Sequence, residues 1–139
     1  MADPDCLFCG IVAGSIPSQI VDSDDQTVAF MDIAPATPGH ALVVPRTHSA
    51  DLLEIGADDL SATVLAAQRL ARRMKEVLEA DGINLINACG AAAWQTVFHF
   101  HIHVVPRYAD DPLKLPWIPE EGDPDQIAKV AEKLRGDDG

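Results

Sequence analysis

The chain has 139 residues, of which 47% are hydrophobic, and it carries a formal net charge of −12. This length and composition suit one domain with a hydrophobic core, and no segment reaches the roughly 20 apolar residues that a transmembrane helix needs. We expect no signal peptide, because a basic and then apolar start is absent, and no nucleic-acid binding, whose affinity depends on basic residues contacting phosphates.

Near the N-terminus, Cys6 and Cys9 form a CxxC pair, a spacing that lets one tight turn present two thiolates to a tetrahedral zinc ion. A thioredoxin-like redox pair is the alternative, but it needs a preceding strand, and residues 1–5 are too short to form one. Neutral imidazole is the usual partner of such thiolates, so His48 and one histidine of residues 99–103 are candidate ligands. Three cysteines, two of them candidate metal ligands, do not suggest a disulfide framework, and a reducing cytoplasm is expected.

Three strands are predicted in the first third of the chain. Residues 20–22 and 27–32 are separated by an acidic turn at residues 23–26. A third apolar run at residues 41–44 begins after a Pro-Gly pair and is closed by Pro45. Short turns between successive strands favour antiparallel pairing.

The longest helical pattern follows, from about residue 58 to residue 80. Asp58 or Asp59 can cap its start, and Gly82 suits its end. Apolar side chains recur at three- and four-residue steps and predict one buried stripe, made by Leu60, Val64, Ala67, Ala71, Met74 and Leu78.

Strands at residues 83–87 and 99–106 come next, and the second one holds three of the five histidines, His99, His101 and His103. Alternate side chains of a strand point to opposite faces, so the three imidazoles should share one face at a spacing of about 6.6 Å. The residues between them are apolar and suit a core. A buried structural role could explain one histidine, but it is a weak explanation for three in register, and histidine serves as nucleophile, proton carrier and metal ligand.

The last part of the chain predicts an irregular, proline-rich segment at residues 113–119 and a helix opened by the Asp-Pro pair at 123–124. Strands, one long helix and returning strands predict an α+β fold, with an antiparallel sheet of about five strands and helices to one side. No repeat or linker divides the chain. We therefore expect a single domain over residues 1–139, with a core at about 6–107 and a C-terminal extension at 108–139.

These motifs belong to three longer segments, which lie between Cys6 and Arg107. The segments read CLFCGIVAGSIPS at the start, VAFMDIAPATPGHALVVPRTH up to His48, and GAAAWQTVFHFHIHVVPR from Gly90. Together they resemble the zinc-containing, bacterial-type branch of the histidine triad (HIT) family of nucleotide-binding hydrolases. The resemblance implies the HIT fold and a homodimer, which the residue spacing itself does not show.

The resemblance implies one zinc ion bound by Cys6, Cys9, His48 and His99. A closed site with two cysteines and two histidines leaves no open coordination position, so this zinc would be structural and would tie the N-terminus to the histidine strand. Without the CxxC pair, an ordinary surface position would be the better interpretation of His48.

The resemblance also implies the catalytic residues. His101 would be the nucleophile that attacks the α-phosphorus, provided that an acceptor such as a backbone carbonyl fixes the proton on its other ring nitrogen. His103 would bind the phosphate or pass a proton to the leaving group. Gln95 and Thr96 would supply an amide and a hydroxyl beside the phosphate, and Gly90 would let the backbone approach it.

For the nucleoside, the resemblance implies that Asp32 accepts hydrogen bonds from both ribose hydroxyls, although a turn residue is the alternative. Five positions match the base pocket but could equally be core residues: Leu7, Phe8, Ile11, Phe30 and Ile33. Two departures stand out. Ala88 occupies a position where the family often has an asparagine that contacts phosphate or ribose, with Asn87 one step earlier. Either the loop shifts to bring Asn87 into place as a substrate-binding residue, or that contact is absent. Trp94 replaces a common glycine and has no assigned role.

The expected function is hydrolysis at the α-phosphate of purine nucleotide conjugates, similar to an adenosine phosphoramidase, through a nucleotidyl-histidine. His103 favours hydrolysis, because the branch that transfers nucleotides tends to have glutamine there. A dinucleoside polyphosphate hydrolase is the alternative enzyme. A nucleotide-binding protein with little turnover also stays open, because of Ala88.

Overall fold

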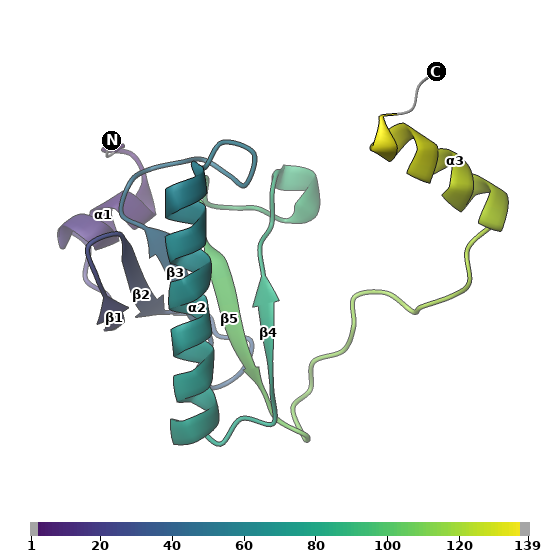
Figure 1. The fold of residues 1–139 in the computed structure, drawn as a ribbon. Helices are drawn as coiled ribbons and strands as arrows, with labels where there is room; N and C mark the ends of the chain where they lie inside the picture. The colour runs from purple at the N-terminus through teal and green to yellow at the C-terminus, as the bar shows by residue number, and fades with distance from the viewer. Residues whose placement is uncertain (1–2, 137–139) are drawn as a thin grey trace.

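The protein folds as a five-stranded antiparallel sheet with a long helix across one face (Figure 1). The computed structural model describes residues 3–136. Its strands are β1 (Ile20–Ser23), β2 (Thr27–Met31), β3 (Ala41–Pro45), β4 (Gly82–Ile86) and β5 (Ile102–Arg107), in the spatial order β1-β2-β3-β5-β4. Its helices are α1 (Leu7–Ala13), α2 (Ala57–Val77) and α3 (Pro124–Arg135), and one 3₁₀ turn, η1, spans Ala91–Ala93. The predicted α+β fold with an antiparallel sheet is confirmed.

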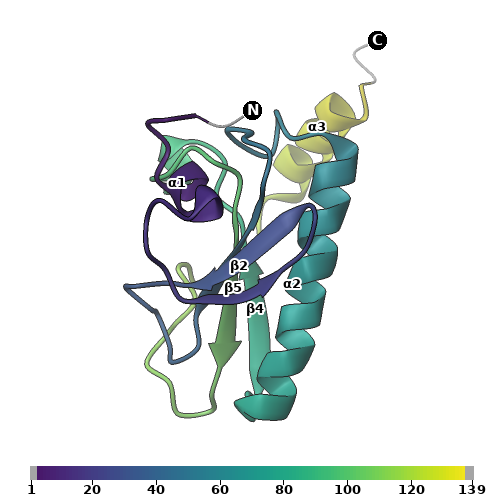
Figure 2. The same cartoon turned by 90° about the vertical axis from the view of Figure 1, so that its left-hand side faces the viewer.

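The two faces of the sheet are covered by different helices (Figure 2). On one face, α2 packs over a core that includes Ala29, Ala41, Val43, Ile102, Val104, Leu70 and Met74. On the other, α1 covers a smaller core made by Phe8, Ile11, Val28, Phe30, Leu42 and Val44. Because side chains alternate along a strand, the choice of core residues also fixes which polar side chains lie on the α1 face.

Helix α2 differs from its prediction in its ends and in its buried side. Gly56 is the N-cap without a side-chain hydrogen bond, while Asp58 and Asp59 lie in the first turn. There their negative charges interact favourably with the helix dipole, but their side chains do not cap the backbone. Helix α2 ends at Val77, three residues earlier than predicted, because the left-handed φ of Glu79 (56°) stops it, and Gly82 instead begins β4.

The predicted apolar stripe of α2 is correct only in part. Val64 and Leu78 are 43% and 42% exposed. The residues that the helix buries are Thr63, Ala66, Ala67, Leu70 and Met74. Small side chains at the contact let the helix backbone approach the sheet, and hydrophobic periodicity gives them little weight.

The N-terminal helix α1 was not predicted, since only a tight turn was expected around the CxxC pair. Cys6 is its N-cap, and the Cys6 sulfur accepts a hydrogen bond from the Cys9 amide at 3.3 Å. Gly14 ends the helix with φ at 83°, a conformation that suits glycine. The first turn of α1 therefore brings the two cysteines together.

The C-terminal helix α3 begins at Pro124, as predicted, and Asp123 caps it by accepting from the Asp125 amide. It lies apart from the sheet (Figure 1), and none of its residues is buried. Among residues 3–136, no helix has the length and apolar character that crossing a membrane requires.

Candidate active site and metal centre

The three histidines of the HxHxH motif lie on the α1 face, although the predicted strand was too long. Strand β5 begins only at Ile102. Before it, the backbone leaves β3, and the Phe100 amide donates to the Ser49 carbonyl at 2.7 Å. Side-chain alternation nevertheless continues, because Phe100 is buried in the core beneath α2, while the His101 ring packs against the Phe8 ring of α1.

Four side chains from three parts of the chain converge beside α1. The ligand atoms of Cys6, Cys9, His48 and His99 all lie within 4.8 Å of one another. The Nδ1 atom of His99 is 3.4 Å from the Cys6 sulfur and 3.5 Å from the Cys9 sulfur. The Nδ1 atom of His48 is also 3.4 Å from the Cys9 sulfur. Tetrahedral zinc with ordinary bond lengths separates sulfur and nitrogen ligands by roughly 3.6 Å, so the cluster has the size of a zinc site.

The protonation state of His99 also suits a metal ligand. Its Nε2 donates to the Pro45 carbonyl at 2.8 Å, so the proton lies on that nitrogen and the Nδ1 lone pair faces the sulfurs. The imidazole is fully buried. These residues could thus hold a metal that joins the start of α1, the loop after β3 and the segment before β5.

His101 has the tautomer that a nucleophile needs. Its Nδ1 donates to the His99 carbonyl at 2.7 Å, which leaves the lone pair on Nε2. The Phe8 ring packs edge-on against the imidazole, with centroids 5.0 Å apart. Burial lowers the pKa of His101, and this effect outweighs the bond to the carbonyl, so the ring is neutral near pH 7.

A fourth histidine, His40, completes the site. The Ala36 amide donates to His40 Nδ1 at 2.9 Å, so the His40 proton lies on Nε2. That nitrogen is 3.0 Å from Nδ1 of His103 and 3.5 Å from Oδ2 of Asp32. His40 therefore donates to Nδ1 of His103. A neutral His103 has one ring N–H proton, which must then lie on Nε2.

The two adjacent triad histidines consequently present opposite groups. His101 offers a lone pair on Nε2, and His103 offers an N–H on Nε2, with ring centroids 5.0 Å apart. Burial and the nearby His101 and His40 lower the pKa of His103 to about 4, with Asp32 opposing the shift. Burial likewise lowers the pKa of His40, and the Asp32 charge partly offsets this effect. Near pH 7 the site thus holds neutral imidazoles in a defined order of donors and acceptors.

His40 was missed in the sequence, although strand register could have located it. Leu42 of β3 pairs with His103 of β5 and belongs to the core beneath α1. Two positions earlier on the same face comes His40, and the Asp32 amide donates to its carbonyl at 3.1 Å. The alternation of side chains along the predicted third strand therefore indicates that His40 and Leu42 share a face. It places His40 beside the triad only once the pairing of β3 with β5 is known.

The loop before the triad is held by Gln95. Its Oε1 accepts from the Gly90 amide at 2.8 Å, and its Nε2 donates to the Ala50 and Val97 carbonyls at 2.8 and 3.1 Å. The Gln95 amide is buried and fully engaged, so in this structure it shapes the loop. Thr96 is exposed.

Gly90 and Asn87 also have defined local roles. Gly90 has a left-handed φ of 93°, which glycine adopts without strain. Asn87 donates from Nδ2 to the His101 carbonyl at 2.9 Å and so holds the backbone of the triad from the side of β4. Their predicted contacts to phosphate or ribose stay predictions.

The residues predicted to bind the nucleoside divide into three groups. Asp32 lies beside the triad through His40, and its Oδ1 also accepts from the Ala34 amide at 2.8 Å in a local turn. Three predicted base-pocket residues are buried in the core between α1 and the sheet: Phe8, Ile11 and Phe30. Leu7 and Ile33 are exposed, by 48% and 100%. The structure brings Asp32 to the histidines and leaves the base contacts as predictions.

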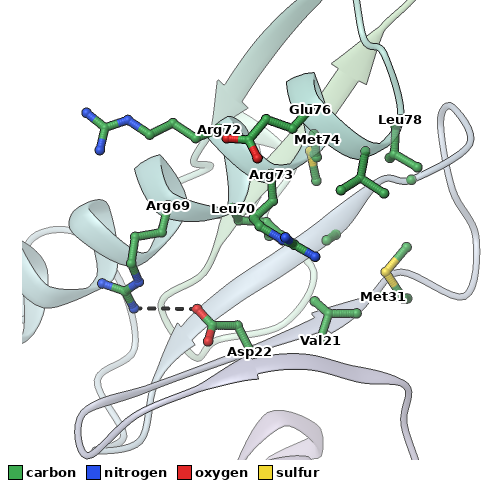
Figure 3. Close-up of a pocket in the computed structure, with 13 residues that line it drawn as sticks. Val21, Asp22, Met31, Arg69, Leu70, Arg72, Arg73, Met74, Glu76 and Leu78 are labelled. Carbon is green, nitrogen blue, oxygen red and sulfur yellow. Dashed lines mark ion pairs between the residues drawn. The ribbon is translucent and has the colours of Figure 1, made fainter.

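Two cavities of similar volume lie at different places in the structure. One of about 600 Å³ has His40 and His103 among its lining residues. Another of about 680 Å³ lies between α2 and the strands β1 and β2 (Figure 3), where Arg69 pairs with Asp22 at 3.5 Å. None of the five histidines lines this second cavity, so of these two cavities only the first adjoins the histidine cluster.

Comparison with known proteins agrees with this geometry. The family profile described as HIT domain matches residues 13–110. An uncharacterized HIT-like protein of Saccharolobus solfataricus is 46% identical over 107 residues, 77% of either chain. A zinc-bound histidine triad family protein of Mycobacterium smegmatis has a TM-score of 0.77 at 36% identity, covering 97% of this chain and 98% of its own. The histidine triad nucleotide-binding protein of Candida albicans has a TM-score of 0.84 at 32% identity, covering 96% of both chains.

Proposed function

The chain belongs to the HIT family, and from this premise we propose that it hydrolyses purine nucleotide conjugates at the α-phosphate, as an adenosine phosphoramidase does. The observation that carries the proposal is the pair of opposite groups at the site. His101 Nε2 has a free lone pair, and His103 Nε2 has a proton to donate. A phosphoryl group placed between them meets a nucleophile and a donor within hydrogen-bonding reach.

In the first step, His101 Nε2 attacks the α-phosphorus, an N–P bond forms, and the bond to the leaving group breaks. The anionic substrate raises the pKa of the neighbouring imidazoles, so the His40–His103 pair takes up one proton at Nδ1 of His40, where it displaces the hydrogen bond from the exposed Ala36 amide, and Asp32 stabilises its charge. His103 then passes its Nε2 proton to the departing atom while the Nε2 proton of His40 moves to Nδ1 of His103, so both rings are neutral and Nε2 of His103 has a lone pair.

In the second step, water attacks the nucleotidyl group. His103, now neutral, takes the water proton, the new P–O bond forms, and the N–P bond to His101 breaks. The products are a nucleoside monophosphate and the released group. The Nδ1 bond from His101 to the His99 carbonyl keeps the same tautomer through both steps.

We further propose that Cys6, Cys9, His48 and His99 bind structural zinc. Their mutual distances and the lone pair of His99 support this, and so does the zinc-bound relative from Mycobacterium smegmatis. When bound, the ion supplies cross-linking of the N-terminus to the catalytic segment. Substrate does not reach it, because four protein ligands complete its coordination.

Turnover assays test the proposal. Adenosine 5′-phosphoramidate and a diadenosine polyphosphate are incubated separately with the purified protein and with His101→Ala. We expect AMP and ammonia from the phosphoramidate, at least ~10³-fold slower formation by the variant, and a lower kcat/KM for the diadenosine compound. Preference for the diadenosine compound would instead indicate a dinucleoside polyphosphate hydrolase. Tight nucleotide binding with turnover of neither compound would indicate a binding protein.

A further inference from the structure

The cavity between α2 and the strands β1 and β2 lies on the opposite face of the sheet from the histidines. Its volume of about 680 Å³ is within the range of small-molecule sites. Met31 and Ala41, which pair across β2 and β3, both line it. Asp32 follows the first of them in the chain and His40 precedes the second, and their side chains lie at the triad. The sheet therefore separates this cavity from the catalytic residues.

Three arginines of α2 line this cavity, although the chain as a whole is acidic. The chain has 22 acidic and only 10 basic residues, yet Arg69, Arg72 and Arg73 gather here. Arg69 and Arg73 are four positions apart, a spacing at which like charges on a helix repel each other and destabilise it. A bound anion would relieve this repulsion.

The three arginines differ in the partners that they already have. Arg69 binds two carboxylates, Asp24 at 2.9 Å and Asp22 at 3.5 Å (Figure 3). Within residues 3–136, Arg73 forms no ion pair, and its side chain extends from α2 toward β1 (Figure 3). Asp22 and Glu76 also line the cavity and would repel a polyanion. The arrangement favours a ligand with one negative charge, placed on Arg73.

The apolar part of the lining favours an alkyl chain. It consists of aliphatic and thioether side chains, which include Val21, Met31, Leu70, Met74, Val77 and Leu78. As far as residues 3–136 form this lining, it contains no aromatic ring on which a nucleobase could stack. Methionine side chains adapt to flexible apolar groups, because they are unbranched and have three rotatable bonds.

We propose that this cavity is a second ligand site, which binds a medium-chain aliphatic carboxylate through Arg73 and places its alkyl chain against Met31 and Met74. The planar guanidinium can donate two parallel hydrogen bonds to a carboxylate, and the methylene groups leave water for the apolar lining. The inference does not depend on the proposed hydrolysis, since none of the histidines lines this cavity.

Calorimetric titration of the full chain with octanoate tests the ligand class. We expect saturable binding at sub-millimolar concentration. Butyrate should bind at least ~10-fold more weakly, because it lacks four methylene groups. Octylamine has the same alkyl chain but a positive charge, and it should also bind at least ~10-fold more weakly, although the net charge of −12 would favour it in non-specific binding.

Three variants test the residues. Arg73→Gln should weaken octanoate binding by roughly ten-fold or more, because a charge-assisted bond is lost. Asp22→Asn should tighten binding by about two-fold or more, because a carboxylate of the lining is removed, and a folding defect would not have this effect. Lys75→Gln is the matched control. It removes a cation of the same helix that does not line the cavity, and it should leave the affinity unchanged.

NMR of methyl-labelled methionines tests the location, because two of the three methionines line the cavity. Octanoate should shift the methyl signals of Met31 and Met74 in the wild-type protein, and it should shift them less at the same concentration in Arg73→Gln. The inference would be overturned if octanoate showed no saturable binding at millimolar concentration, which would leave the arginines as a cover for the apolar surface of α2. Equal binding of octylamine would also overturn it. So would shifts confined to the histidine ring signals, since octanoate would then bind in the catalytic cleft.

Discussion

Replacing His40 with alanine removes the donor that orients His103. The imidazole is buried and connects the Ala36 amide, Asp32 and Nδ1 of His103. In the variant, water can replace the hydrogen bond to the exposed Ala36 amide. The space left by the imidazole and the unpaired Nδ1 of His103 remain inside the protein. We expect the variant to lose about 2–4 kcal/mol of unfolding free energy, which corresponds to a melting temperature lower by about 10 °C.

The effect on catalysis should be larger than this destabilisation explains. Without His40 the proton of His103 can occupy either nitrogen, so kcat should fall by roughly 10²–10⁴-fold in the folded variant. His40→Gln should recover at least ten-fold of the loss, because its amide can donate to Nδ1 of His103. Thr37→Val is the matched control. It removes a buried bond of 2.6 Å to the Pro106 carbonyl in the same turn and should lower stability but not kcat.

The assay combines thermal melting, steady-state hydrolysis of adenosine 5′-phosphoramidate and an NMR titration of His103. The pKa of His103, about 4 in the wild type, should rise in His40→Ala, because both burial and repulsion from His40 are reduced. The reasoning would be refuted by a folded His40→Ala protein whose kcat stays within three-fold of the wild type and whose His103 titrates unchanged.

Three further predictions address the metal, the sugar and the pH dependence. Cys6→Ser should lose the zinc that elemental analysis finds in protein made with zinc present, and its melting temperature should fall by at least ~10 °C; unchanged zinc content would contradict the site. If Asp32 binds both ribose hydroxyls, AMP should bind on the order of 10- to 100-fold more tightly than 2′-deoxy-AMP, and Asp32→Asn should reduce the difference; equal binding would leave Asp32 as a turn residue. Unfolded His103 takes up its proton near pH 6.5 but folded His103 only near 4, so stability should fall as the pH drops through this window. Urea unfolding of His103→Gln beside the wild type should show their stability difference changing between pH 7 and pH 4.5, and a constant difference would argue against the lowered pKa.

The strands could be predicted because their signals are local. Alternating apolar residues bounded by Pro45, the acidic turn at residues 23–26 and other turn residues placed β1 to β4 within one or two residues. Helix α1 could not be predicted in the same way. Its seven residues, LFCGIVA, are too few to show a period, and a cysteine N-cap is not one of the usual capping residues.

The candidate site likewise contains residues that the sequence predicts and residues that it does not. The spacing of His99, His101 and His103 identifies them in the sequence, whereas placing His40 at the site requires the pairing of β3 with β5. The engagement of Gln95 within its own loop also has no sequence signal, since its partners include Ala50, 45 positions earlier. Long-range register and side-chain geometry therefore decide what the motif alone cannot.

The central claim is that His101 is the covalent nucleophile, and rapid quenching tests it most directly. Wild-type protein mixed with excess adenosine 5′-phosphoramidate and quenched during turnover should carry one adenylyl group, which peptide mass spectrometry should place on His101. The group should be absent from His101→Ala and should accumulate when His103 is replaced by alanine, if hydrolysis of the intermediate slows more than its formation. An adenylyl group found on His99 or His103, or a His101→Ala protein that keeps a tenth of the wild-type activity, would contradict the account.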